Sequence, residues 1–172
     1  GTGLMNDALF NTGTRNQPLG DRKSGVSPEL DALAAYVASL NQQAASPYRN
    51  ADGTLTADGA AGKTIFQNAN CAQCHGGVDF TTSGSATLFN IGTLKPSSGK
   101  RLNGPLAGID PPTLRGAWAT APYLHDGSAA TLAEAVRAHN NETISDADLN
   151  KLVAYLQQLD GNEPSAPAPV TT

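Results

Sequence analysis

Residues 71–75 read "CAQCH", and this stretch decides how the rest of the chain is interpreted. Cys71 and Cys74 are the only cysteines, and His75 follows the pair directly. In a Cys-x-x-Cys-His segment, both thiols reach the vinyl groups of one haem while the histidine ligates the iron. The same residues also fit a redox dithiol, a disulfide or half of a zinc site. The surrounding sequence has to separate these alternatives.

The rest of the chain favours haem. A zinc site needs a second ligand pair at similar spacing, and the other two histidines, His125 and His139, are too far apart in sequence to supply one. A thioredoxin-like dithiol needs a βαβ context, which the apolar pattern does not contain. The sequence therefore predicts one haem c, attached through Cys71 and Cys74, with His75 as the proximal iron ligand.

Composition limits both the core and the partners of the chain. Its 172 residues are 39% hydrophobic and include 18 glycines and 11 prolines, so a modest core with long loops is expected. The net charge of −4 and the scattered basic residues argue against nucleic acid or an anionic membrane as a partner. No stretch approaches the roughly 18 apolar residues of a membrane-spanning helix. We therefore expect no membrane insertion. We also expect either that an export signal has been removed or that the sequence is a segment of a longer protein.

Apolar spacing predicts a mostly α-helical fold. Four amphipathic helices are expected, over residues 28–43, 57–69, 131–140 and 145–159. Thr56, Thr131 and Ser145 are suited to cap the last three of them. Residues 76–115 show no sustained helical period, which is typical of a segment that wraps another group. The chain should therefore combine helices with long irregular loops.

Two longer stretches carry a family resemblance. Residues 60–77, "AAGKTIFQNANCAQCHGG", resemble the N-terminal helix and haem-binding turn of a class I-like c-type cytochrome, including the spacing of Gly62 and Phe66. Residues 111–136, "PPTLRGAWATAPYLHDGSAATLAEAV", are similar to the C-terminal haem domain of bacterial di-haem cytochrome c peroxidases. The resemblance implies a cytochrome c-like helical fold around a covalent haem.

The chain divides into four regions. We expect an N-terminal extension over 1–43, a connector over 44–56, the cytochrome c domain over 57–160 and a Pro-rich linker over 161–172. Within the extension, "SPELDALAAYVASL" aligns with "ADLNKLVAYLQQL" near the C-terminus. Amphipathic helices often look alike, which is one interpretation of this match. The other is that the extension is the end of a degenerate upstream cytochrome-like domain.

The resemblance implies roles for residues around the haem. In the family a proline carbonyl accepts a hydrogen bond from the proximal histidine, and Pro105 and Pro112 are both candidates here. Arg115 matches an arginine near the haem that would pair with a propionate, unless it is simply a surface residue. His125 matches a position that supports the haem or a propionate, with structural packing as the alternative.

The second axial ligand departs from the family pattern. Class I cytochromes usually use a methionine, and the only methionine here, Met5, lies far upstream of the motif. His139 stands at the position where the peroxidase-like domains have their methionine. We therefore predict ligation by His75 and His139 and a six-coordinate haem, with Met5 or an open iron as alternatives.

These residues predict an electron carrier rather than an enzyme. Peroxide chemistry needs an open iron and, in the di-haem enzymes, a second haem, whereas this chain has one Cys-x-x-Cys-His segment. A redox protein partner is expected, by analogy an extracellular copper oxidase such as a polysaccharide monooxygenase, or a quinone-type dehydrogenase. The location should be periplasmic or extracellular, as a module of a larger bacterial protein. The alternatives are a haem peroxidase-like enzyme and a haem-based sensor.

Overall fold

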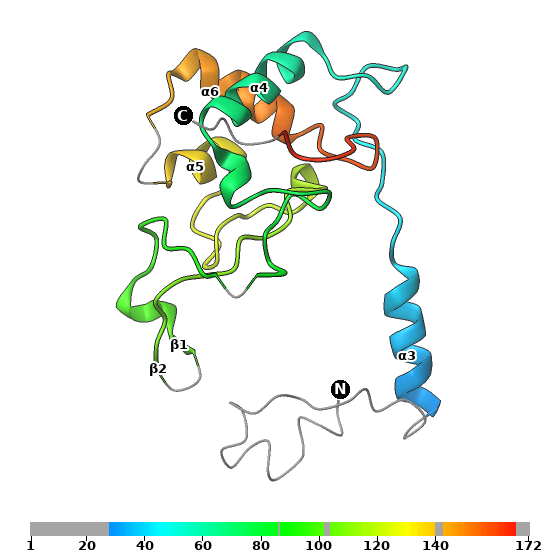
Figure 1. The fold of residues 1–172 in the computed structure, drawn as a ribbon, viewed down its shortest axis with the longest axis vertical. Helices are drawn as coiled ribbons and strands as arrows, with labels where there is room; N and C mark the ends of the chain where they lie inside the picture. Colours follow the sequence, from blue (N-terminus) through cyan, green and yellow to red (C-terminus); the bar gives the residue numbers. More distant parts are fainter. Residues whose placement is uncertain (1–27, 86, 102–103, 140–142, 168–172) are drawn as a thin grey trace. The chain divides into compact units, whose positions relative to one another are not determined.

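The computed structural model describes residues 28–85, 87–101, 104–139 and 143–167. In these ranges the chain forms four α-helices and very little strand (Figure 1). The helices and strands are α3 (Pro28–Ser39), α4 (Ala57–Asn68), α5 (Leu132–Arg137), α6 (Asp146–Leu156), β1 (Lys100–Arg101) and β2 (Gly104–Pro105). Three short 3-10 turns, η2 (Cys71–Gln73), η3 (Pro96–Ser98) and η4 (Ala117–Ala119), complete the set. The predicted mostly helical fold is confirmed.

The chain separates into two compact units. One contains residues 1–42 with 100–104, and the other contains 43–99 and 105–172. Within the first unit, α3 has no buried residue. Met5 lies outside the described residues. No helix in the described ranges is long and apolar enough to cross a membrane. The second unit contains the Cys-x-x-Cys-His segment and therefore the candidate site.

The helices of the second unit begin at the residues predicted to cap them. The hydroxyl of Thr56 accepts from the Gly59 N–H at 3.1 Å, and Thr131 forms a capping box with Glu134. Ser145 caps α6 in the same way. These side chains satisfy N–H groups that have no partner within the first helical turn.

Helix α5 is shorter than the sequence predicts. It ends at Arg137 rather than near residue 140, and His139 follows it. The Ala135 carbonyl accepts from His139 Nδ1 at 2.9 Å, while the His139 backbone N–H donates to Val136 at 3.1 Å. The imidazole thus occupies the Ala135 carbonyl, which would accept the His139 backbone N–H if the helix continued. This competition gives a physical reason why α5 ends early.

A close crossing of α4 and α6 forms the centre of the fold (Figure 1). A Cβ atom on Gly62 would lie 2.0 Å from the backbone oxygen of Lys151, and one on Gly59 would lie 2.6 Å from the Gln158 side chain. Glycine is therefore required at position 62, because a side chain there would overlap the backbone of α6, whereas one at position 59 would displace the Gln158 side chain. This is why α4 tolerates residues with poor helix propensity.

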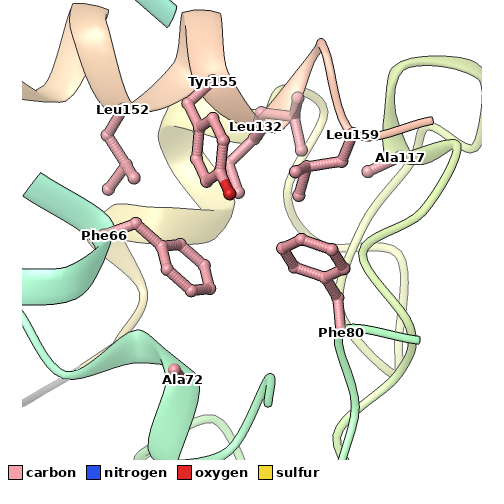
Figure 2. Packing of buried hydrophobic residues seen from close by; sticks show 9 residues of the cluster. Phe66, Ala72, Phe80, Ala117, Leu132, Leu152, Tyr155 and Leu159 are labelled. Carbon is pink, nitrogen blue, oxygen red and sulfur yellow. The ribbon is translucent and has the colours of Figure 1, made fainter. Parts of the chain in front are cut away.

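Aromatic rings fill the space beside this crossing. Phe66 of α4 packs edge-to-face against Tyr155 of α6, with ring centroids 5.6 Å apart, and against Phe80 at 6.2 Å (Figure 2). The buried cluster consists of Phe66, Ala72, Phe80, Ala117, Leu132, Leu152, Tyr155, Leu156 and Leu159. Since Phe80 comes from the irregular segment and Ala117 from η4 just after it, this part of the chain is anchored to the helices by its own apolar residues.

The described part of the C-terminal segment, 161–167, is not the free linker that the sequence predicts. Glu163 is 3% exposed and Asp160 is fully buried. Arg49 from the predicted connector pairs with Asp160 at 2.9 Å and with Glu163 at 3.4 Å, and Lys63 pairs with Glu163 at 2.5 Å. Buried carboxylates need such partners. The packed unit therefore includes parts of both the connector and the tail, which composition alone did not indicate.

Candidate haem site

Helix α4 leads directly into the turn that carries the cysteines. Asn70 adopts a left-handed conformation with φ of 55°, which ends the helical direction and starts η2. The N–H groups of Cys74 and His75 both donate to the Cys71 carbonyl, at 3.2 and 2.9 Å. A Cβ on Gly76 would lie 2.6 Å from the Ala72 oxygen, so the turn closes tightly. Two thiols and one imidazole are thereby held on one short, fixed piece of backbone.

A backbone carbonyl fixes the ring of His75. Its Nδ1 donates to the Pro112 carbonyl at 3.0 Å, and since a carbonyl can only accept, the proton is on Nδ1 and Nε2 carries a lone pair. Burial lowers the pKa of His75 to about 4, partly opposed by the Pro112 carbonyl, so the ring is neutral at pH 7. Of the two candidate prolines, the structure places Pro112 on His75, whereas Pro105 lies in β2.

His139 is held in the same way. Its Nδ1 donates to the Ala135 carbonyl at 2.9 Å, which leaves Nε2 as the ring nitrogen available for ligation. An electrostatic interaction with His139 also contributes to lowering the pKa of His75, so the two imidazoles lie within electrostatic reach of one another. The sequence did not identify Ala135, although its place four residues before a histidine at a helix end is a usable signal. His75 and His139 are 64 positions apart in the sequence, and each ring has its Nδ1 held by a backbone carbonyl.

The donor set fits a covalent haem better than a bare metal ion. Cys71 and Cys74 are both half-buried thiols, Cys71 packs against the core, and burial raises the pKa of Cys74. Among the described residues, no three His, Cys, Asp or Glu side chains gather as they would around a metal ion. Two thiols on one turn with a separate pair of imidazoles match two thioethers and two axial ligands.

The irregular segment also offers an incompletely covered apolar lining. Several large apolar side chains of this segment and of the stretch that leads from it to α5 are only half-buried and do not belong to the core, namely Leu88, Phe89, Ile91, Leu94, Leu106, Ile109, Trp118 and Leu124. In the part of the chain that the structure describes, Asn70 Oδ1 and Thr93 Oγ1 are buried without a hydrogen-bond partner. A large, mostly apolar group with polar edges would cover this apolar surface and give the buried polar atoms hydrogen-bond partners. The residues present therefore fit haem.

The structure gives Arg115 partners other than the propionate expected from sequence. Its guanidinium donates to the Val78 carbonyl through Nε at 2.8 Å and to the Glu163 carbonyl at 2.8 Å, and it also donates to the carbonyl of Asp160. It lies over the ring of Phe80, 5.1 Å from the centroid. Arg115 thus ties the backbone after the haem motif to the C-terminal segment, and a propionate would have to compete with these carbonyls.

His125 lies on the surface rather than among the residues around His75. Its Nε2 is 2.8 Å from the hydroxyl of Ser98, and the neighbouring Asp126 pairs with Lys95 at 2.9 Å. These contacts attach the turn at η3 to the segment before α5. A haem-supporting role for His125 stays a prediction.

Comparison with known proteins agrees with the fold and the donor set. The sequence profile of the RoxA-like, cytochrome c-like family matches residues 108–143. The chain resembles the hydrazine synthase subunit gamma of Kuenenia stuttgartiensis, with 31% identity over 80% of this chain and 47% of the relative. A solved structure of that hydrazine synthase has a TM-score of 0.55 at 29% identity, covering 77% of this chain and 56% of the other. The shared fold is therefore that of a cytochrome c-like protein.

Two peroxidases are similar over a comparable part of the chain. The cytochrome c551 peroxidase of Nitrosomonas europaea is 29% identical over 82% of this chain and 48% of its own length. The cytochrome c peroxidase Ccp of Escherichia coli is 32% identical over 76% of this chain and 32% of its own length. The chain spans about half, or less, of the length of these curated relatives.

The fold, the donor set and these similarities define a c-type cytochrome domain that carries covalent haem c. More particularly, it is a cytochrome c-like haem domain homologous to the cytochrome c peroxidases. The prediction that the chain is not an enzyme is wrong, because the relatives it matches are named as peroxidases and as a synthase subunit. A single haem motif in this chain does not exclude an enzyme, since the relatives are much longer than this chain.

Proposed function

We propose that this chain is the electron-transferring haem domain of a peroxidase-type oxidoreductase. It takes single electrons from a redox protein and passes them to another redox centre of the same oxidoreductase. One haem c supplies the one-electron chemistry when it is bound. Cys71 and Cys74 would hold it covalently, and His75 and His139 would each supply a nitrogen ligand to the iron.

The pair of imidazoles is the observation that carries this proposal. Both rings have Nδ1 fixed to a backbone carbonyl, at 3.0 Å for His75 and 2.9 Å for His139. In both rings Nε2 is thereby left available to a metal, and outer contacts of this kind orient metal-bound histidines and raise their basicity. An iron closed on both sides keeps its ligands between oxidation states, which suits electron transfer. An open iron would suit peroxide binding.

Peroxide chemistry on this domain itself is the second candidate, and the names of the relatives favour it. The two functions differ in what the reduced protein reacts with. We expect ferrous holoprotein to be oxidised rapidly by ferric mitochondrial cytochrome c in stopped-flow mixing. The rate should fall as salt is added, since the net charge of −4 would attract a basic partner. Oxidation by hydrogen peroxide should be much slower.

The opposite order of rates would contradict the proposal. Fast reaction with peroxide, together with turnover by the isolated chain, would make this domain the peroxide-reducing one. Heat-denatured holoprotein provides the control, because exposed haem reacts with peroxide regardless of the native ligands.

The partner and location follow from the same proposal. We infer a periplasmic or extracellular redox protein as the electron donor, because covalent haem attachment of this kind takes place on the exported side. The similarity to peroxidases supports a peroxidase-type electron chain. The polysaccharide monooxygenase expected by analogy from the sequence has no counterpart among the names of these relatives.

We also propose that residues 1–43 belong to a separate, cytochrome-like unit. Large apolar residues of α3 and of the position just after it are exposed, with Leu33 at 54%, Tyr36 at 62% and Leu40 at 64%. Their counterparts in the internal match are Leu152, Tyr155 and Leu159 of the second unit, at 1% or less. In the second unit those residues lie in α6 or shortly after it, and they share a buried cluster with Phe66 of α4. We infer that a helix like α4, in another domain, packs against the exposed face of α3.

Limited proteolysis of the holoprotein tests this arrangement. We expect early cleavage between residues 28 and 45, and a resistant haem-bearing fragment that begins near Ser46. Ser46 should be protected because its N–H donates to buried Asp160 at 2.8 Å. Protection of residues 28–45 over the same period would mean that α3 packs against this chain, and the proposal would fail.

A further inference from the structure

The carbonyl that fixes His75 belongs to a segment with little backbone support. Pro112 follows Pro111, and neither residue has an N–H to donate. Pro112 itself is exposed. The segment 110–114 lies between the antiparallel bridge at Ile109 and the bond from the Gly116 N–H to Leu159. Its position depends on side chains that reach it from elsewhere.

Two threonine hydroxyls supply that support on either side of Pro112. Thr81 Oγ1 donates to the Pro111 carbonyl at 2.5 Å. Thr113 Oγ1 donates to the Asp79 carbonyl at 2.5 Å. The two bonds run in opposite directions between residues 79–81 and 111–113, so they form a clamp that encloses the Pro112 peptide.

The other side of the clamp is anchored to the haem-binding turn. The N–H and hydroxyl of Thr82 both donate to the Cys74 carbonyl, at 3.1 and 2.9 Å. The Thr81 N–H donates to the Gly76 carbonyl at 2.8 Å, and Phe80 is fully buried in the core. Residues 79–82 therefore have a fixed position relative to His75. The hydrogen bonds of Thr81 and Thr113 therefore fix the Pro112 peptide relative to His75.

We propose that Thr81 and Thr113 are positioning residues that set the reduction potential of the haem through the hydrogen bond from His75 to Pro112. This rests on the proposed ligation by His75. A strong bond from Nδ1–H to a carbonyl makes the imidazole a better electron donor, which favours ferric iron. Loss of the clamp lets the Pro112 carbonyl move away, weakens that bond and favours ferrous iron.

The test compares valine and serine at both positions in the holoprotein. Valine has the shape of threonine without the hydroxyl, whereas serine retains it. At the midpoint potential of the parent, Thr81→Val/Thr113→Val should raise the ferrous-to-ferric ratio by about threefold to tenfold, a tenfold change being 59 mV for a one-electron couple. Thr81→Ser/Thr113→Ser should restore the parent potential. The electron paramagnetic resonance g values should shift in the valine variant only.

A matched control separates the clamp from general effects of removing a hydroxyl. Thr120 Oγ1 also donates to a backbone carbonyl, that of Ala117 at 3.3 Å, but it lies outside the clamp. Thr120→Val should therefore leave the potential unchanged. If the double valine variant does not retain haem, Thr113→Ala and Thr113→Ser replace it, because they differ only in the hydroxyl.

Two failures are distinguishable. A pyridine haemochrome spectrum without haem c in the parent protein would refute the proposed function. Haem c in every variant with one shared potential would overturn the role of the threonines and leave the proposed function intact. A potential that changes equally in the valine and serine variants would also overturn it, since the hydroxyls would then not be responsible.

Discussion

His139→Ala is expected to convert the ferric haem from low-spin to predominantly high-spin. The substitution removes one of the two proposed axial nitrogens and leaves Cys71, Cys74 and His75 in place. Added imidazole should enter the vacated position and restore the low-spin spectrum. Visible absorption and electron paramagnetic resonance would measure the conversion, and an imidazole titration would measure the rescue.

His125→Ala is the matched control for that experiment. His125 is exposed, and its Nε2 interacts with Ser98 rather than with the residues around His75. Its loss should leave the spectrum unchanged. If His139→Ala retains a low-spin spectrum without imidazole, His139 is not the ligand, and Met5 should be replaced next.

Gly62→Ala is expected to destabilise the protein strongly, although it adds only one methyl group. The new Cβ would lie 2.0 Å from the Lys151 backbone oxygen and 2.8 Å from Tyr155 Cβ. Neither atom can move without shifting α6, so α4 and α6 would have to separate. We expect the free energy of unfolding to fall by about 3 kcal/mol, measured by chemical denaturation of the holoprotein.

Gly84→Ala provides the comparison for Gly62. An added Cβ at Gly84 would meet no atom within 4 Å. This variant should unfold within about 0.5 kcal/mol of the parent. Equal stability of the Gly62 and Gly84 variants would mean that the α4–α6 crossing is looser than the structure indicates.

The parts of the fold that depend on local pattern could be predicted from sequence. Thr56, Thr131 and Ser145 cap helices because a hydroxyl at that position satisfies free N–H groups wherever the helix packs. The haem-binding turn was predictable for a similar reason, since all its donors lie within five consecutive residues. The prediction of His139 as a ligand depends on the family resemblance and on its position after the short helix.

The parts that depend on contacts between distant segments could not be predicted. The proline content of the tail predicts a linker, yet Glu163 is buried by pairing with Arg49 and Lys63. The family resemblance pairs Arg115 with a propionate, while its guanidinium binds backbone carbonyls, which sequence does not display. The choice of Pro112 over Pro105 likewise depends on how the irregular segment returns to His75.

The ligation of the iron is the central claim, and the electron paramagnetic resonance spectrum of the ferric holoprotein tests it most directly. The protein needs no substitution for this measurement. Ligation by His75 and His139 predicts low-spin signals that account for nearly all of the iron at neutral pH. A high-spin signal from most of the iron would show an open site, and would contradict the proposal that this domain transfers electrons through a closed haem.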